Sequence, residues 1–316
     1  MLSRVADSLY WLSRYLERAE HTARITSVYL DIALDRSGRL GEDRRYQQFK
    51  EILQIDGQAS GESDTRRLIE STVFDAQNPK SIVYAINMAR ENARQVREQI
   101  STEAWVQINQ LYLLMKHPPE GLWRAQPQMF MQDLVRNFYL AGGISDATMS
   151  HNEGWHFMRL GGFMERADAI VHLLDAHFRL NAGFGDTVAD YLELVALLRC
   201  LTAFEAYCNV YTANLVPAQV AEFLLLNPVF PHSLRFAVNQ MHEALQGIAL
   251  LTKSQRNEGL NRQAGRLQSQ LQFAAIDEIM VGGLQPFLLD VQGQYRRIHE
   301  LVYQVYISFP VAEELA

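Results

Sequence analysis

The chain has 316 residues, of which 48% are hydrophobic and 21% charged, and its formal net charge at pH 7 is -7. This composition excludes overall disorder, and the acidic balance argues against nucleic acid or an anionic membrane surface as the partner. No stretch approaches the length of a membrane span, and charges interrupt the first apolar run, so we expect no signal peptide. Cys200 and Cys208 lack metal-type or redox-type spacing, which favours a reduced, cytoplasmic protein.

Helical periodicity runs almost continuously along the chain, and most prolines fall between the periodic runs. No run shows sustained period-two alternation. The sequence therefore predicts an all-α fold, a helical bundle of two internally repeated halves packed as one body. The predicted helices cover residues 3–36, 43–56, 64–75, 80–100, 102–116, 127–141, 150–182, 188–212, 217–226, 232–252, 258–281 and 286–308.

The first predicted helix carries apolar residues at the three-and-four spacing that indicates one buried stripe. An adjacent Glu17-Arg18 pair lies in this helix, and the same pair returns as Glu165-Arg166. Neighbouring helical residues project about 100° apart, so the two members of a pair cannot point at the same position of a partner helix. The expected stripe consists of Leu2, Val5, Leu9, Leu12, Leu16, Ala19 and Ala23.

Two stretches of the chain repeat in the same order. The two Glu-Arg pairs lie 148 positions apart, and at that offset Leu12 meets Leu160. Residues 81–87 resemble residues 233–239 at an offset of 152, and an Asn-Pro pair precedes both blocks. We interpret this as an internal duplication of about 150 residues, with chance similarity of amphipathic helices as the alternative. The break at 141–146 suggests halves 1–143 and 144–316, too closely joined for a free linker.

The Glu-Arg pairs have two interpretations. In the structural one, the charges flank the apolar stripe and pair with charges on other helices, because buried charges persist only when paired. In the functional one, Arg18 and Arg166 line a central groove and bind a carboxylate or phosphate. We favour the structural interpretation, because the motif lies mid-helix beside large apolar residues. The candidate partners are Arg90, Glu91 and Arg94, with Glu243 as their second-half counterpart.

One face of the second Glu-Arg helix resembles a set of metal ligands. Glu165, Asp168, His172 and Asp175 lie at spacings of three, four and three, which places them on one side of a helix. Di-iron bundles need carboxylate and histidine ligands from more than one helix. The first half has Arg24 where the second half has His172, so we expect a structural or solvated face, with no metal and no cofactor.

Residues 1–11, leading into 15–20, resemble the opening of the bacterial alpha-E proteins. That family is named for its all-helical fold and Glu-Arg motif, and its function is unassigned. The resemblance extends to 89–94, to 148–150 before Trp155, and to 160–168, so it spans both halves. The family commonly has arginine where this chain has Gly162, and Pro-Arg-Ser where residues 231–233 read Pro-His-Ser. If those arginines bind something, the second half has lost part of the site.

The resemblance also implies a context. Alpha-E proteins are typically encoded beside circularly permuted ATP-grasp proteins, and often beside transglutaminase-like and proteasome-like peptidases. It therefore implies an accessory or substrate-presenting subunit, with no catalytic activity of its own, in an ATP-grasp-dependent system for peptide synthesis or peptide modification.

Two alternatives stay open at this point. One is an enzyme with an acidic, arginine-lined helical cleft, formed by Glu17, Arg18, Glu165 and Arg166, that binds an anionic or peptide substrate. The other is a self-associating helical scaffold, a homo-oligomer. A deep polar pocket holding both Glu-Arg pairs favours the enzyme, and a dry, paired network with an exposed apolar patch elsewhere favours the subunit.

Overall fold

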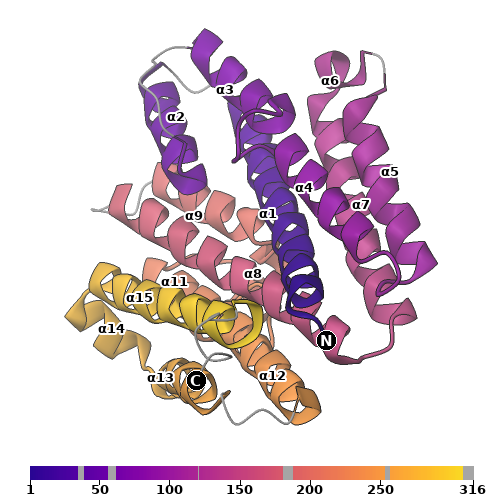
Figure 1. The fold of residues 1–316 in the computed structure, drawn as a ribbon. Coiled ribbons are helices and arrows are strands. Elements are labelled where there is room, and N and C mark those ends of the chain that lie inside the picture. Colours follow the sequence, from indigo (N-terminus) through magenta and orange to yellow (C-terminus); the bar gives the residue numbers. More distant parts are fainter. Residues whose placement is uncertain (35–38, 56–61, 120, 181–187, 253–256, 309–316) are drawn as a thin grey trace.

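The computed structural model describes residues 1–34, 39–55, 62–119, 121–180, 188–252 and 257–308 (Figure 1). Within these ranges every regular element is a helix, which confirms the predicted all-α class. The helices are α1 (Ser3–Leu34), α2 (Arg39–Leu53), α3 (Glu62–Phe74), α4 (Ile82–Gln95), α5 (Thr102–Lys116), α6 (Leu122–Ala125), α7 (Pro127–Thr148), α8 (Glu153–Leu180), α9 (Val188–Cys200), α10 (Phe204–Tyr211), α11 (Pro217–Leu226), α12 (Leu234–Thr252), α13 (Glu258–Phe273), α14 (Ile276–Gly282) and α15 (Leu284–Val302), followed by a π-helical turn, η2 (Tyr303–Ile307).

The fold is organised around the crossing of α1 and α8, the two Glu-Arg helices (Figure 1). Helices α4, α5 and α7 pack with α1 in a closed ring of contacts. Helices α12, α13 and α15 make the corresponding ring with α8. The fold thus contains two four-helix bundles, and the first helix of each bundle contributes to the crossing that joins them.

Helix α1 is buried on more than one face. Leu9, Leu12, Ala19 and Ala23 are fully buried, as the apolar spacing predicts, but Leu2 is 72% exposed. The prediction of a single stripe is too narrow, because α4, α7 and α8 all contact this helix. Consequently its polar residues are also drawn into the interior of the protein.

The crossing depends on one glycine. A Cβ atom on Gly161 would lie 2.1 Å from the carbonyl oxygen of Tyr10, far inside van der Waals contact. The neighbouring Gly162 has room, because its nearest neighbour would be Ser13 Cβ at 3.9 Å. Helix α8 therefore touches the backbone of α1 only because residue 161 has no side chain.

The two halves share a local cap. Ser81 Oγ accepts a hydrogen bond from the amide of Tyr84 at 3.1 Å before α4, and Ser233 Oγ accepts one from the amide of Phe236 at 3.1 Å before α12. Each serine hydroxyl also donates to the carbonyl oxygen of the residue six positions earlier. Matching residues thus have matching geometry, while their origin by duplication stays a prediction.

The break expected at 141–146 is wrong. Helix α7 continues through Gly142 and Gly143 to Thr148, and the chain turns only at 149–152. A helix tolerates glycine at a cost of about 1 kcal/mol, so the pair alone does not end it. The predicted division between 143 and 144 therefore falls inside a helix, and the division into two halves stays a prediction.

Other helix boundaries also differ from those predicted. The helix expected over 188–212 is bent by 116° between α9 and α10, where Thr202 has a φ of 51°. The helix expected over 258–281 is divided by extended backbone at Ala274. The short α6 is absent from the prediction, and the predicted ends at 35–36, 56 and 181–182 lie outside the described residues.

No single helix in the described ranges has the length and apolar character needed to cross a membrane. The bent pair of α9 and α10 passes that test only when its two members are taken together, by length and composition.

The close approach at Gly161 predicts opposite effects for two adjacent substitutions. Gly161→Ala should lower the free energy of unfolding by about 3 kcal/mol, because the new methyl group meets a backbone carbonyl that cannot rotate away. Gly162→Ala should leave it unchanged or raise it by up to about 1 kcal/mol through helix propensity. Urea unfolding of both variants checks this. Equal effects would show that the helices do not cross at this residue.

Candidate functional site

The two Glu-Arg motifs bind each other across the crossing. Arg18 Nε donates to Glu165 Oε1 at 2.6 Å, and its Nη2 donates to Oε2 at 3.1 Å. Arg166 Nε donates to Glu17 Oε1 at 2.6 Å, and its Nη2 donates to Oε2 at 2.8 Å. Both are two-point guanidinium–carboxylate pairs, the geometry in which arginine binds a carboxylate most specifically. The partner of each motif is therefore the other motif.

The Glu165 side of the crossing contains a second arginine. Arg14 Nε donates to Glu165 Oε2 at 2.7 Å, and Arg14 Nη2 donates to the hydroxyl of Tyr295 at 3.0 Å. Burial alone would raise the pKa of Glu165, but the charges and hydrogen bonds of Arg14 and Arg18 outweigh it and lower that pKa to about 2. On this side the buried carboxylate of Glu165 is paired with two arginines.

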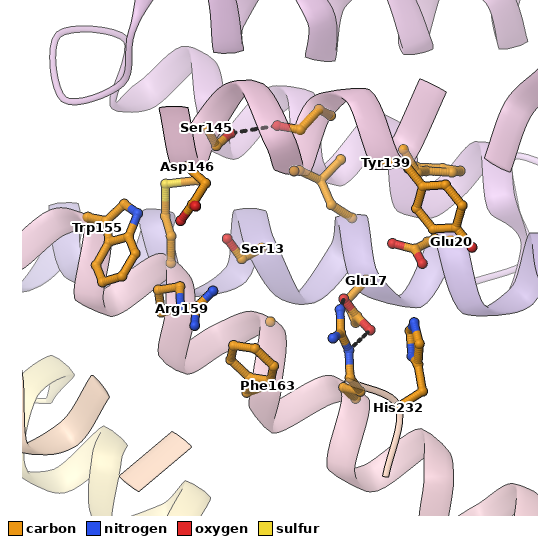
Figure 2. A pocket seen from close by; sticks show the side chains of 17 residues that line it. Ser13, Glu17, Glu20, Tyr139, Ser145, Asp146, Trp155, Arg159, Phe163 and His232 are labelled. Carbon is orange, nitrogen blue, oxygen red and sulfur yellow. Dashed lines mark hydrogen bonds and ion pairs between the residues drawn. The ribbon is translucent and has the colours of Figure 1, made fainter. Parts of the chain in front are cut away.

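Among the described residues no second arginine binds Glu17, and this side is hollow. A cavity of about 310 Å³ lies over the crossing, with Glu17 in its wall (Figure 2). Gly162 also lines it. Helices α1, α7 and α8 supply most of the lining, together with His232 from the turn before α12. The polar and aromatic lining residues are Ser13, Glu17, Glu20, Phe138, Tyr139, Ser145, Asp146, Trp155, Arg159, Phe163, Arg166 and His232.

One end of the cavity carries Glu20, Tyr139 and His232 (Figure 2). Glu20 is only 8% exposed, and its Oε1 accepts no hydrogen bond from the described residues, although Arg24 Nε lies 3.4 Å away. Burial, reinforced by the charge of Glu17, raises the pKa of Glu20 to about 7. This carboxyl group therefore changes its charge near neutral pH.

His232 is also buried, and its Nδ1 has no hydrogen-bond partner among the described residues. Burial and then the charges of Arg24 and Arg166 hold the pKa of His232 well below its usual value. At neutral pH the ring is uncharged, so it presents a neutral nitrogen beside the titratable carboxyl group of Glu20.

The opposite end of the cavity carries Asp146, Trp155 and Arg159 (Figure 2). The Arg159 guanidinium lies 4.6 Å from the centre of the Phe163 ring and 5.1 Å from that of Trp155. It hydrogen-bonds to Gln240. Each end of the cavity thus has a carboxylate and an arginine, Glu20 with Arg166 at one end and Asp146 with Arg159 at the other, an arrangement suited to binding a charged or dipolar organic molecule.

The partners proposed for the Glu-Arg motifs lie elsewhere. Glu91 forms ion pairs with Arg90 at 3.3 Å and Arg94 at 3.0 Å on α4, away from Glu17. The expectation that this cluster pairs with the motif is wrong, because α4 packs its apolar face on α1, directs Arg90 to Asn109 and Tyr112 of α5, and leaves Glu91 and Arg94 exposed. Glu243 accepts a hydrogen bond from Gln240 at 2.7 Å. Gln240 in turn accepts one from Arg159, so Glu243 is linked to Arg159 through Gln240.

The carboxylate–histidine face of α8 does not assemble a metal site. Glu165 is occupied by two arginines, Asp168 lies 3.4 Å from His172 Nδ1, and Asp175 pairs with Arg179 at 3.5 Å. Among the residues that the structure describes, no group of three or more metal-type ligands converges.

Several residues of the site are absent from the sequence-based candidates. Arg14 precedes Arg18 by four positions, one helical turn, and at the offset of 148 it corresponds to Gly162. The sequence repeat alone thus shows that an arginine on one side of the crossing is matched by a glycine on the other. Tyr139, Asp146 and Arg159 carried no comparable signal, because only the packing of α7 and α8 against α1 brings them to the cavity.

The structure fully meets neither the condition set for the enzyme, a deep polar pocket with both Glu-Arg pairs, nor the condition set for the subunit, a paired network with an apolar patch elsewhere. The cavity contains the Glu17–Arg166 pair, and the Glu165–Arg18 pair lies in the network with Arg14. An exposed apolar groove exists at the distant α13–α15 end, where Phe273 is 78% exposed. The structure therefore combines a polar pocket with an apolar patch elsewhere.

Comparisons with known proteins agree on one family. The model of the family Alpha-E, described as a predicted alpha-helical domain with a conserved ER motif, matches residues 1–307. The chain is also 22% identical over 344 residues to uncharacterized proteins of Mycobacterium bovis and Mycobacterium tuberculosis. These alignments cover 97% of this chain but 37% of each relative, so the chain spans little more than a third of the relatives' length. No solved structure matches.

Removal of the two arginines that bind Glu165 should have unequal effects. Arg14→Ala should lower the free energy of unfolding by about 3–5 kcal/mol, because a buried network loses its central cation. Arg18→Ala should cost less, because the Arg18 side chain is 28% exposed and water can replace it. Denaturant unfolding of the two variants measures the difference. A larger loss for Arg18→Ala would contradict this assignment.

Glu20 should make stability depend on pH. Its pKa is raised to about 7 from about 4.3 in the unfolded chain, so the folded state binds more protons in between and stability falls as the pH rises through that range. Glu20→Gln should remove this loss, which is roughly 3–4 kcal/mol for a shift of that size. The check is the difference in unfolding free energy between wild type and variant at pH 4.5 and at pH 8. A difference that does not change with pH would show that Glu20 titrates normally.

Proposed function

The chain belongs to the Alpha-E family, and on that premise we propose that it is the substrate-presenting subunit of an ATP-grasp-dependent system that synthesises or modifies a peptide. The observation that carries the proposal is the cavity over the crossing of the two motif helices. It has charged groups at both ends and rigid helical walls, which suits holding a charged molecule in one orientation.

The bonding within the cavity favours holding a substrate over transforming it. Both oxygens of Glu17 are bound by Arg166, so this pair forms a fixed wall. The groups with remaining bonding capacity are Glu20, His232 and the guanidinium of Arg159. These are groups that recognise charge. ATP-grasp enzymes form amide bonds through acyl phosphates, and a companion that holds the acceptor amine would supply the second reactant.

The relatives give independent support for a role beside other domains. They are much longer than this chain, and the match covers 37% of their length. In those proteins the helical domain is joined to further sequence. A domain that presents a substrate to another domain fits both arrangements, either as a separate subunit or as part of a longer chain.

The first test uses the ATP-grasp protein encoded beside this chain, as the family resemblance implies. We expect the two proteins to co-elute, and ADP release by the ATP-grasp protein to depend on this chain. Glu20→Gln should lower the ADP release rate, and Glu103→Gln, an exposed glutamate on α5, should not. No co-elution together with an unchanged rate would refute the proposal.

One observation favours the enzyme as second candidate. A carboxyl group with a pKa of about 7, such as Glu20, is suited to accept and return a proton at neutral pH. Turnover of a peptide by this chain alone, lost in Glu20→Gln, would identify the enzyme. The self-associating scaffold stays a third hypothesis, for which the groove beside Phe273 offers a surface.

A further inference from the structure

The two sides of the α1–α8 crossing have the same ion-pair geometry but different contents. On each side a glutamate of one helix takes a two-point contact from the arginine of the other. Glu165 Oε2 then receives one more guanidinium nitrogen, Arg14 Nε at 2.7 Å. Among the described residues, the corresponding oxygen of Glu17 receives no guanidinium nitrogen beyond those of Arg166. Glu17 itself therefore has one guanidinium partner fewer than Glu165, although a second arginine on this side, Arg24, lies 3.4 Å from Glu20.

The missing cation corresponds to a particular position. Arg14 lies one helical turn before Arg18, and Gly162 lies one helical turn before Arg166. Arg14 reaches from α1 to the glutamate of α8. A side chain on Gly162 would reach from α8 toward Glu17, and both residues line the cavity. The hollow is thus the space that an arginine at this position would occupy.

The environment of Arg14 shows what a guanidinium requires here. Its charged end is bound by Glu165, and its plane lies 4.9 Å from the centre of the Trp11 ring and 5.6 Å from that of Tyr10. Guanidinium groups stack on aromatic faces as well as pairing with carboxylates.

The cavity offers the same two kinds of contact. Glu17 and Glu20 supply carboxylates, and Tyr139, Phe163 and Trp155 supply rings (Figure 2). Glu20 is buried, and its Oε1 accepts no hydrogen bond among the described residues. A buried oxygen without a donor is costly, and a ligand that donates to it removes that cost.

Two arginines also line the cavity, and their positive charges would oppose the binding of a cation close to them. Arg166 is neutralised by its two-point contact with Glu17. Arg159 lies at the other end, beside Asp146, against the Trp155 ring (Figure 2). Arg24 does not line the cavity, and its Nε lies 3.4 Å from Glu20 Oε1 without hydrogen-bonding to it. At this end Glu20 therefore keeps an oxygen that a guanidinium in the cavity can bind, and Arg159 is placed to meet an anionic or carbonyl group farther along the same molecule.

We propose that this cavity binds the guanidinium group of an arginine side chain of a peptide substrate, in the position that Arg14 occupies on the other side of the crossing. The inference rests on the proposed function only in taking the cavity as the place where substrate is held. It identifies the substrate as arginine-containing.

The test is calorimetric titration of this chain alone with three small probes: the Nα-acetylated amides of arginine, citrulline and lysine. Citrulline has nearly the shape of arginine without its charge. We expect arginine to bind at least tenfold more tightly than either of the others. Equal binding of citrulline would overturn recognition of the charge, equal binding of lysine would overturn the guanidinium assignment, and no binding of arginine would overturn the whole proposal.

A filled cavity provides the matched control. Gly162→Arg should abolish binding of the arginine probe without lowering the melting temperature, because the new side chain takes the place of the ligand. Gly143→Arg adds the same charge at an exposed position of α7 and should bind as wild type does. Glu20→Gln, a substitution of similar shape, should weaken binding at least tenfold. Full binding by Gly162→Arg or by Glu20→Gln would overturn the proposal.

These measurements separate the inference from the proposed function. Arginine binding that is lost in Gly162→Arg, without any effect of this chain on ADP release, would refute the subunit role and leave the inference intact. ADP release that depends on this chain, without binding of any probe, would refute the inference and leave the subunit role intact.

Discussion

The contact between α1 and α8 at Gly161 is the constraint on which the rest of the structure depends. The backbones touch there, so the side chains one and two turns away meet at fixed separations. Those side chains are the two Glu-Arg pairs, each of which binds the other. Removing such charges from water is costly, and only two-point hydrogen bonding in good geometry offsets that cost. A rigid crossing supplies this geometry, and the ion pairs in turn fix how the helices lie.

The cavity follows from a missing side chain and does not require the helices to separate. The same two-point ion pair forms across the crossing on both sides, so both sides have arginine and glutamate side chains that span it. On one side Arg14, with Tyr10 and Tyr295, fills the space beside the glutamate. On the other side Gly162 leaves it open. The opening is thus a partly solvent-accessible hollow with charged walls, placed directly over the contact between the two motif helices.

The sequence predicted the helices well and their mutual arrangement poorly. Helical periodicity and proline placement are local, so α5 and α11 match their predicted ranges to the residue. The bend between α9 and α10 has no glycine or proline to mark it, and only packing explains it. The partner of each Glu-Arg motif depends on which helices touch. Arg90 and Glu91 had suitable charges, but α4 turns them away from Glu17. The importance of Gly161 likewise depends on the neighbouring carbonyl of Tyr10.

The structural and functional interpretations of the Glu-Arg motif each describe one side of the crossing. Around Glu165 the buried polar groups bond to one another, as expected of a contact that stabilises the fold. Around Glu17 two local rules are broken, because a glycine interrupts the helix face and the buried Glu20 lacks a hydrogen-bond donor. Proteins retain such costs mainly where function requires them. Since the same motif serves both sides, stability alone does not explain the open one, and a guanidinium bound there would take the place that Arg14 occupies beside Glu165.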